Sequence, residues 1–298
     1  MFGIIDNNAN TQIFYTKGTD FHTWQKPANA KMISILCLGS GGGGGGGMAS
    51  TATTARRGGG GGGSGAFSHG TFAACQLPDT LYLLVGAGGS AGTPSTNGGS
   101  GALSYVSVRP DTTAINVLLA SGAVAATGGQ TGSNGAAAGT GGTIWTGNIL
   151  NNLGLATAQA GTNGGAGAIS SLATSITPSM IVCGGPSGGN TSTSVAFAGG
   201  DITGSGFLNT IPGGALGSGS TAGGHGSDGY LPNLLSSLKT GPVIFTAGSG
   251  GGASVSGQGG NGGSGSYGCG GAGGGAGFTN LAGNGGKGGD GLIIITCW

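Results

Sequence analysis

The residues that could perform acid–base, nucleophilic or metal chemistry are few and dispersed in this sequence. The three histidines are His22, His69 and His225, and none lies at metal-ligand spacing from another histidine or a cysteine. His225 and Asp228 are close enough in sequence to form a polar pair, which we interpret as a solvated loop pair rather than a catalytic dyad. All seven acidic residues are aspartates, and their scatter does not indicate the two facing carboxylates of a glycosidase.

The short motifs typical of enzymes have no support from their context. G-x-S-x-G occurs around Ser90 and Ser187, but neither serine follows the strand and precedes the helix that a nucleophile elbow needs. A phosphate-binding loop needs Gly-Lys-Ser/Thr, whereas Gly286-Lys287 is followed by Gly288. The sequence therefore predicts no catalytic residues, no metal site and no cofactor, and we expect that the protein is not an enzyme.

Composition favours a structural or adhesive protein. Glycine accounts for 79 of 298 residues, and charged residues for only 5%, against about 25% in an average domain. A net charge of +1 provides no field that would attract nucleic acid. Disorder is an alternative for such a composition, but disordered chains usually combine low hydrophobicity with high net charge. Collagen is excluded because no Gly-X-Y period persists.

The glycines come in runs placed directly after short apolar strands. Leu38 precedes a run that includes Gly41 to Gly47, and similar runs follow Val85, Cys183 and Thr246. Glycine costs roughly 0.5–1 kcal/mol more than alanine to order, and in return it lets backbones approach closely. We expect these runs to form packed, polyglycine-II-like segments with three residues per turn; mobile loops are the alternative.

The predicted fold is mainly β: a glycine-rich β-sandwich with polyglycine-II-like packed segments, in a single domain over residues 1–298. Strands of residues 1–40 are expected to pair with a strand over 292–298 that buries Trp298, and residues 41–291 form the glycine-rich body. One short helix is predicted near 231–239, where Leu231, Leu234, Leu235 and Leu238 follow helical spacing. The predicted strands are 11–16, 21–24, 32–38, 81–85, 103–108, 114–119, 143–146, 179–183, 195–198, 242–246 and 292–298.

The sequence also indicates where the protein is made. No apolar stretch reaches the 18 residues of a membrane helix, and the first residues lack the basic region of a secretory signal. We expect synthesis in a cytoplasm and no membrane insertion. The five cysteines, Cys37, Cys75, Cys183, Cys269 and Cys297, are odd in number and widely spaced, which predicts free thiols.

Surface binding is the function that these features leave open. Residues 48–57 lie between two glycine runs and would form a displayed loop tip that carries Arg56 and Arg57. Tyr230, Tyr267 and Phe278 are aromatics in glycine-rich surroundings, where they could contact a partner or fill gaps in the glycine core. We take these five residues as receptor-binding candidates.

The two ends of the chain resemble the glycine-rich tail-fibre and adhesin-like virion proteins of tailed bacteriophages. The similarity rests on Trp24-Gln-Lys26-Pro27 before a strand and the heptaglycine, and on Gly289-Asp290-Gly291 before the last strand. This resemblance implies a virion protein made in the host cytoplasm, most simply a tail fibre or adhesin that binds a host surface receptor, either a glycan or an outer-membrane protein. It also implies contact with other virion proteins and a possible homo-oligomer. A capsid head fibre or decoration protein and an ice-binding polyglycine-II protein are the alternatives.

Overall fold

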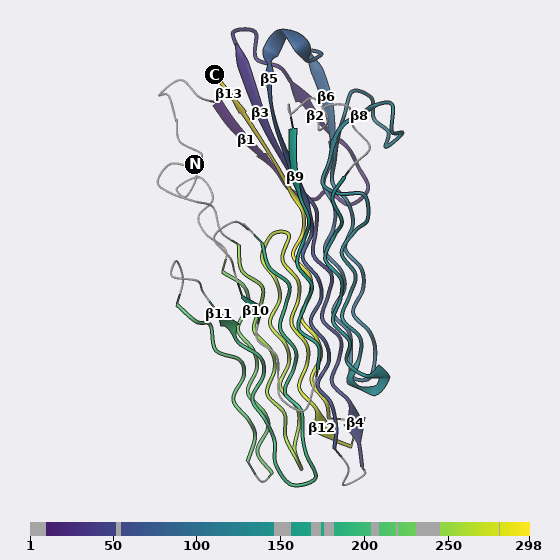
Figure 1. Ribbon diagram of the computed structural model, residues 1–298, viewed down its shortest axis with the longest axis vertical. Coiled ribbons are helices and arrows are strands. Elements are labelled where there is room, and N and C mark those ends of the chain that lie inside the picture. Colours follow the sequence, from purple (N-terminus) through teal and green to yellow (C-terminus); the bar gives the residue numbers. More distant parts are fainter. Residues whose placement is uncertain are drawn as a thin grey trace.

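The computed structural model describes residues 10–51, 55–145, 156–167, 174–175, 182–203, 209–218, 220–230, 245–279 and 281–298. Two β-sheets occupy one end of the elongated molecule, and a bundle of long extended segments continues from them to the other end (Figure 1). The chain passes between these two parts many times, because most strands of the sheets lead directly into segments of the bundle.

The first sheet has five antiparallel strands in the order β1-β13-β3-β5-β9. The carboxy-terminal strand β13 lies between the two amino-terminal strands β1 and β3, which is the pairing that the sequence analysis expects. Trp298, which follows β13, is 42% exposed, so the expectation that it is buried is wrong. The strands are β1 (Asn10–Phe14), β13 (Leu292–Cys297), β3 (Met32–Leu38), β5 (Phe67–Ala73) and β9 (Ala156–Gln159).

A second antiparallel sheet packs against the first and completes a sandwich. It has the order β2-β6-β7-β8, with a register shift between Val106 and Ser107. Ile33, Ile35 and Ile293 of the first sheet share one buried cluster with Trp24 and Leu83 of the second. The four strands are β2 (His22–Gln25), β6 (Thr80–Leu84), β7 (Tyr105–Ser107) and β8 (Val117–Ala120).

The opposite face of the five-stranded sheet supports a second apolar cluster. Alternate residues of a strand point to opposite faces, so Leu292 and Ile294 lie on the side away from Ile293. They pack with Phe245, Cys183 and Cys269, which belong to segments of the bundle. Strand β13 is therefore apolar on both faces, which is typical of a central strand.

Each extended segment of the bundle, which we call a rod, hydrogen-bonds to its neighbours with a period of three residues. In the rod of residues 41–47, the N–H groups of Gly41, Gly44 and Gly47 all donate to one neighbouring segment, at 2.8–2.9 Å. The other N–H groups and the carbonyl oxygens reach five further segments in the same way. The six neighbours are the segments 60–63, 89–95, 96–99, 129–132, 271–274 and 283–289. This is polyglycine-II packing, and the alternative of mobile loops is wrong for these segments.

Close approach of backbones, and not an unusual backbone angle, requires glycine inside the bundle. A Cβ added at any residue from Gly41 to Gly47 would lie 1.9–2.2 Å from a backbone oxygen of a neighbouring rod. Positive φ angles occur at only three described glycines, Gly18, Gly135 and Gly268. At Gly41 to Gly47 the rods contact one another directly through their backbones, so there is no room for a Cβ there.

Side chains are placed at the outer faces of the peripheral rods, again every third residue. Asn284, Lys287 and Asp290 follow this spacing in one rod, and Asn261 and Ser264 follow it in the next. Several of these side chains accept hydrogen bonds from a neighbouring backbone where no further rod is present. Asn261 Oδ1 accepts from the Asn284 N–H at 2.9 Å, for example. At the surface, these side chains thus accept the backbone hydrogen bonds that a neighbouring rod accepts in the interior.

Several predicted elements differ from the structure. Residues 143–145 and 195–198 do not form strands, although Thr143 hydrogen-bonds to Val124 and Ala196 forms an isolated bridge with Thr191. Strand β5 was not predicted.

The predicted helix near 231–239 lies outside the described residues, as do most of the strands predicted at 179–183 and 242–246. The remaining elements are short: β4 (Ala49–Ser50), β10 (Thr174–Ser175), β11 (Ile202–Thr203), β12 (Gly277–Phe278) and the 3-10 helices η1 (Ala74–Gln76) and η2 (Gly132–Asn134).

His69 on β5 makes the stability of the fold dependent on pH. Its Nε2 lies 2.8 Å from the Ser34 Oγ, and burial lowers the pKa of the imidazole below its ordinary value. The unfolded chain therefore binds a proton at a higher pH than the native protein does, and the free energy of unfolding should decrease as the pH falls through about 6.5. Urea denaturation at pH 8 and pH 5.5 measures this decrease. The variant His69→Gln should show a smaller decrease, and an equal decrease in the variant would contradict this assignment.

Candidate binding surface at the distal end of the bundle

The turns of the bundle gather at the end farthest from the two sheets, which we call the distal end. The rods of residues 41–47, 89–95 and 271–277 run in the same direction away from the sheets, as their parallel hydrogen bonding shows. The short strands β4 and β12 pair with each other at this end (Figure 1). The described parts of the distal turns are residues 48–51, 55–57, 93–97, 131–136, 190–196, 217–218, 220–221, 254–258, 278–279 and 281.

The distal end presents hydroxyl groups and little charge. Thr51, Thr93, Ser95, Thr193 and Thr279 are among its exposed residues. Three large apolar residues are also about half exposed at or beside these turns: Val195, Leu216 and Leu281. Among the described residues of these turns, Arg56 and Arg57 are the only charged ones. Apart from the positive charges of the two arginines, the surface is therefore neutral and polar, with a few isolated apolar side chains.

Arg56 does not belong to the displayed surface, because it is only 2% exposed. Its guanidinium donates to the carbonyl oxygens of Gly277 at 2.9 Å, Ser50 at 3.2 Å and Val255, and to the Thr191 Oγ1 at 3.2 Å. The cation also lies 5.5 Å from the centre of the Phe278 ring.

Through these contacts the Arg56 side chain connects four distal turns: its own turn and those that contain Thr191, Val255 and Gly277. Burial lowers the pKa of its guanidinium, and the carbonyl oxygens offset part of the cost of desolvating the charge. The sequence-based interpretation of Arg56 as a displayed receptor contact is corrected: in this structure the side chain holds the turns together. Phe278 is half-buried, and its ring contacts the Arg56 guanidinium, so this ring too packs mainly within the protein.

Arg57 is the exposed member of the pair. Its Nη1 lies 3.4 Å from the carbonyl oxygen of Gly135, a weak contact with the turn of residues 131–136. Adjacent residues of an extended chain point in different directions, which explains why Arg56 is buried and Arg57 is exposed. Arg57 thus places a positive charge on the otherwise neutral distal end.

The two tyrosine candidates lie at the other end of the bundle, beside the sheets. Tyr267 is half-buried and belongs to the second apolar cluster, with its ring centre 5.7 Å from Phe245 and 5.6 Å from Tyr15. Tyr230 is 54% exposed, and its N–H donates to the Thr246 Oγ1. The five candidates therefore do not form one site. Arg57 alone is displayed at the distal end, and the exposed hydroxyl residues around it were not singled out from the sequence.

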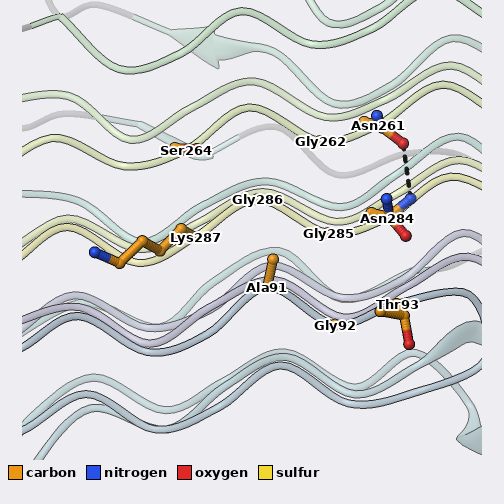
Figure 2. A pocket seen from close by; sticks show the side chains of 10 residues that line it. All are labelled: Ala91, Gly92, Thr93, Asn261, Gly262, Ser264, Asn284, Gly285, Gly286 and Lys287. Carbon is orange, nitrogen blue, oxygen red and sulfur yellow. Dashed lines mark hydrogen bonds between the residues drawn. The ribbon is translucent and has the colours of Figure 1, made fainter.

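A shallow groove of about 300 Å³ lies on the flank of the bundle (Figure 2). Three rods line it, through residues 91–93, 261–264 and 284–287. Its polar groups are partly engaged within the protein: Asn261 Oδ1 accepts from Asn284, and the Lys287 Nζ lies 3.2 Å from Asp290. The groove therefore offers few free groups to a ligand.

His225 and Asp228 take part in the same surface hydrogen bonding. His225 Nδ1 accepts from the Asn261 N–H at 2.9 Å, and Asp228 Oδ1 accepts from the Ser264 N–H at 2.7 Å. Each side chain thus binds the backbone of the adjacent rod, which is a structural role. Among the described residues, no three His, Cys, Asp or Glu side chains gather where they could hold a metal ion. The described part of the chain also contains no helix long and apolar enough to cross a membrane.

A family model described as a glycine-rich domain matches residues 16–298, which include the whole described bundle and every strand of the two sheets except β1 (Asn10–Phe14). No curated protein matches the chain.

Proposed function

The chain belongs to this family of glycine-rich domains, and we propose that it is a bacteriophage virion protein, a tail fibre or adhesin that contacts the host cell surface through its distal end. The resemblance of the two chain ends to such proteins suggests the phage origin. The structure supports the adhesive part of the proposal through the arrangement of its turns.

One observation carries the proposal: the bundle separates a rigid interior, built of glycine and small residues such as Ala253 and Ala276, from a set of turns that bear larger side chains. Backbone hydrogen bonds hold each rod to its neighbours, on six sides for the rod of residues 41–47, so the positions of the distal turns are fixed as well. Recognition residues are typically carried on loops that a rigid scaffold positions. The seven turns with described residues at one end of the bundle fit a contact surface better than they fit a passive spacer.

The same arrangement assigns a role to the other end. The sandwich lies at the opposite end of the bundle from the distal turns, so we propose that it faces the other virion proteins. The receptor would be a glycan or an outer-membrane protein of the host. A surface rich in hydroxyl groups with Arg57 as its one exposed charge among the described turn residues suits either, because both classes of receptor offer hydroxyl or carboxylate acceptors.

Replacing Arg57 with serine tests this assignment without disturbing the fold. The Arg57 side chain is exposed and makes one weak hydrogen bond, whereas Arg56 must stay intact because it joins four turns. If Arg57 binds the receptor, its replacement should weaken adsorption to host cells at least about tenfold, since a hydrogen bond to a charged group contributes roughly 1.5–3 kcal/mol. Adsorption rates of phage carrying the variant protein measure this directly.

Arg109→Ser is the matched control. Arg109 is also an exposed arginine, but it lies in the β7–β8 hairpin at the sandwich end. Its replacement makes the same change in net charge and should leave adsorption unchanged. Equal effects of the two variants would argue against the distal end as the receptor surface.

A head fibre or capsid decoration protein is the alternative, and the same phage distinguish it. In that case both variants would adsorb normally, and any defect of Arg57→Ser would appear in attachment of the protein to the capsid or in the stability of the particle. The ice-binding alternative is not favoured by the flank of the bundle, where the outward positions 124, 127, 130, 137 and 140 carry Val, Thr, Gln, Ala and Thr. A thermal-hysteresis measurement on the purified protein checks it.

A further inference from the structure

Two buried cysteines from adjacent rods lie in direct contact in the second apolar cluster. The Cys183 and Cys269 thiols hydrogen-bond to each other, and the Cys183 N–H lies 3.5 Å from the Cys269 Sγ. Cys183 begins one rod, and Cys269 lies near the start of the neighbouring one. The Gly270 N–H donates to the Cys183 carbonyl at 3.0 Å, so the two backbones are hydrogen-bonded at this level.

The proximity of the two chains satisfies the main geometric requirement of a disulfide. Hydrogen-bonded neighbouring chains lie about 4.8 Å apart, and disulfides join residues whose Cα atoms are about 4.4–6.8 Å apart. The Cys269 Sγ already lies 3.5 Å from the Cys183 N–H, and both side chains are buried in the same cluster, so we expect the bond to need a change of side-chain torsion rather than a shift of the rods. The other buried thiols, Cys37 and Cys297, are not placed in this way: they lie on neighbouring strands, with Cys37 paired to Ile293 and Cys297 to Ile33.

We propose that Cys183 and Cys269 form an oxidation site, at which a small peroxide converts the two thiols into a disulfide that links the rods of residues 183–190 and 268–277. The free thiols described by the structure are then the reduced state of this site. The inference does not depend on the proposed adhesive function, because it rests only on the contact between the two side chains.

The environment of the pair assigns different roles to its two sulfur atoms. Cys183 Sγ accepts a hydrogen bond from the Ala247 N–H at 3.2 Å and another from the Cys269 thiol. Hydrogen bonds to the thiolate lower the pKa of Cys183, whereas burial raises the pKa of Cys269. Cys183 is therefore the thiol that ionises first and attacks the oxidant.

The chemistry balances with hydrogen peroxide as the only co-reactant. The Cys183 thiolate attacks one peroxide oxygen, so that an S–O bond forms, the O–O bond breaks and hydroxide leaves; hydroxide takes up the proton that Cys183 lost. The Cys269 sulfur then attacks the sulfenic acid, the S–S bond forms, the S–O bond breaks, and water leaves with the Cys269 proton. Two thiols are oxidised by two electrons in total, and one peroxide is reduced to two molecules of water.

Peptide mapping of the folded protein after peroxide treatment tests the proposal. Trypsin cleaves after Lys239 and Lys287, which places Cys183 and Cys269 in different peptides, but the Arg109-Pro110 bond resists cleavage and leaves Cys75 with Cys183. The experiment therefore uses Cys75→Ser, which also removes the exposed thiol. Oxidised protein is denatured, alkylated without reduction and digested.

The expected result is the loss of two alkylatable thiols and a linked pair of peptides, 58–239 with 240–287, that separates on reduction. Cys37→Ala, which removes a buried thiol outside the pair, should retain the link, and Cys269→Ala should abolish it. The linked protein should also unfold at a temperature several degrees higher than its reduced form. Free thiols in both peptides after treatment, or a link to Cys37 or Cys297, would overturn the proposal.

Discussion

Replacing Gly44 with alanine should prevent the protein from folding. The added methyl group would lie 1.9 Å from the Ala272 carbonyl oxygen and 2.4 Å from its carbonyl carbon, and both are backbone atoms that no side-chain rotation can move. Gly44 also donates to Gly286 and accepts from Gly92, so a shift of its rod would break hydrogen bonds to other rods. We expect a destabilisation above about 5 kcal/mol, beyond the range of ordinary single substitutions. Soluble yield and thermal unfolding measure it.

Gly18→Ala is the control that separates steric conflict from backbone conformation. A Cβ at Gly18 meets no atom within 4 Å, but the residue has a φ of +74°, which disfavours any side chain. This variant should fold and lose about 1–2 kcal/mol. If Gly44→Ala folds with a similarly small loss, the rods are not packed as tightly as the structure shows.

The sequence predicts the glycine-rich bundle because two independent signals agree there. Each glycine run follows an apolar strand, and charges are nearly absent from the runs. A further signal is visible in Asn284, Lys287 and Asp290, which are separated by glycine pairs. This spacing of three marks the outer face of a rod, because every third residue of such a rod points in the same direction.

Strand β5 shows where sequence-based reasoning about strands fails. Its residues facing the sandwich interior are Ser68, Gly70 and Phe72, so two of the three are small rather than aliphatic. The Ser68 Oγ donates to the Ala120 carbonyl at 2.8 Å, and this contact makes a buried serine acceptable. The partner that explains the residue lies 52 positions away in sequence, and no local pattern reveals it.

The candidate site was predicted less well than the fold, for a similar reason. Two adjacent arginines in a loop suggest a displayed basic patch. The carbonyl oxygens that bury Arg56 come from Ser50, Val255 and Gly277, and two of these residues are about 200 positions away in sequence. Only the packing of the rods brings them to one point. The loop itself could be located from the sequence, but the separate roles of Arg56 and Arg57 could not.

Deletion of residues 292–298 should abolish soluble folding, because β13 contributes buried side chains to both apolar clusters. Leu292, Ile293 and Ile295 are fully buried and Ile294 nearly so, on both faces of the strand. Burial of four such side chains contributes roughly 6–12 kcal/mol at about 1.5–3 kcal/mol each, comparable to the total stability of a domain, about 5–15 kcal/mol. The deletion would also separate β1 from β3 and expose the edges of both strands.

Trp298→Ser provides the matched control for this truncation. Trp298 is 42% exposed. Its backbone carbonyl accepts from the Lys31 N–H at 2.8 Å and the Met32 N–H at 3.0 Å, and its N–H donates to the Met32 carbonyl at 3.1 Å. Serine keeps these hydrogen bonds, so the variant should fold with a loss of no more than about 1–2 kcal/mol. Size-exclusion chromatography measures whether the truncated chain and Trp298→Ser are compact and monodisperse, and circular dichroism measures their thermal unfolding. Phe245 and Cys269 of the bundle pack on Leu292 and Ile294, so the bundle is also expected to depend on β13. A truncated chain that elutes and melts like the full chain would show that the sandwich closes without β13. The expected dependence of the bundle on that strand would then be wrong as well.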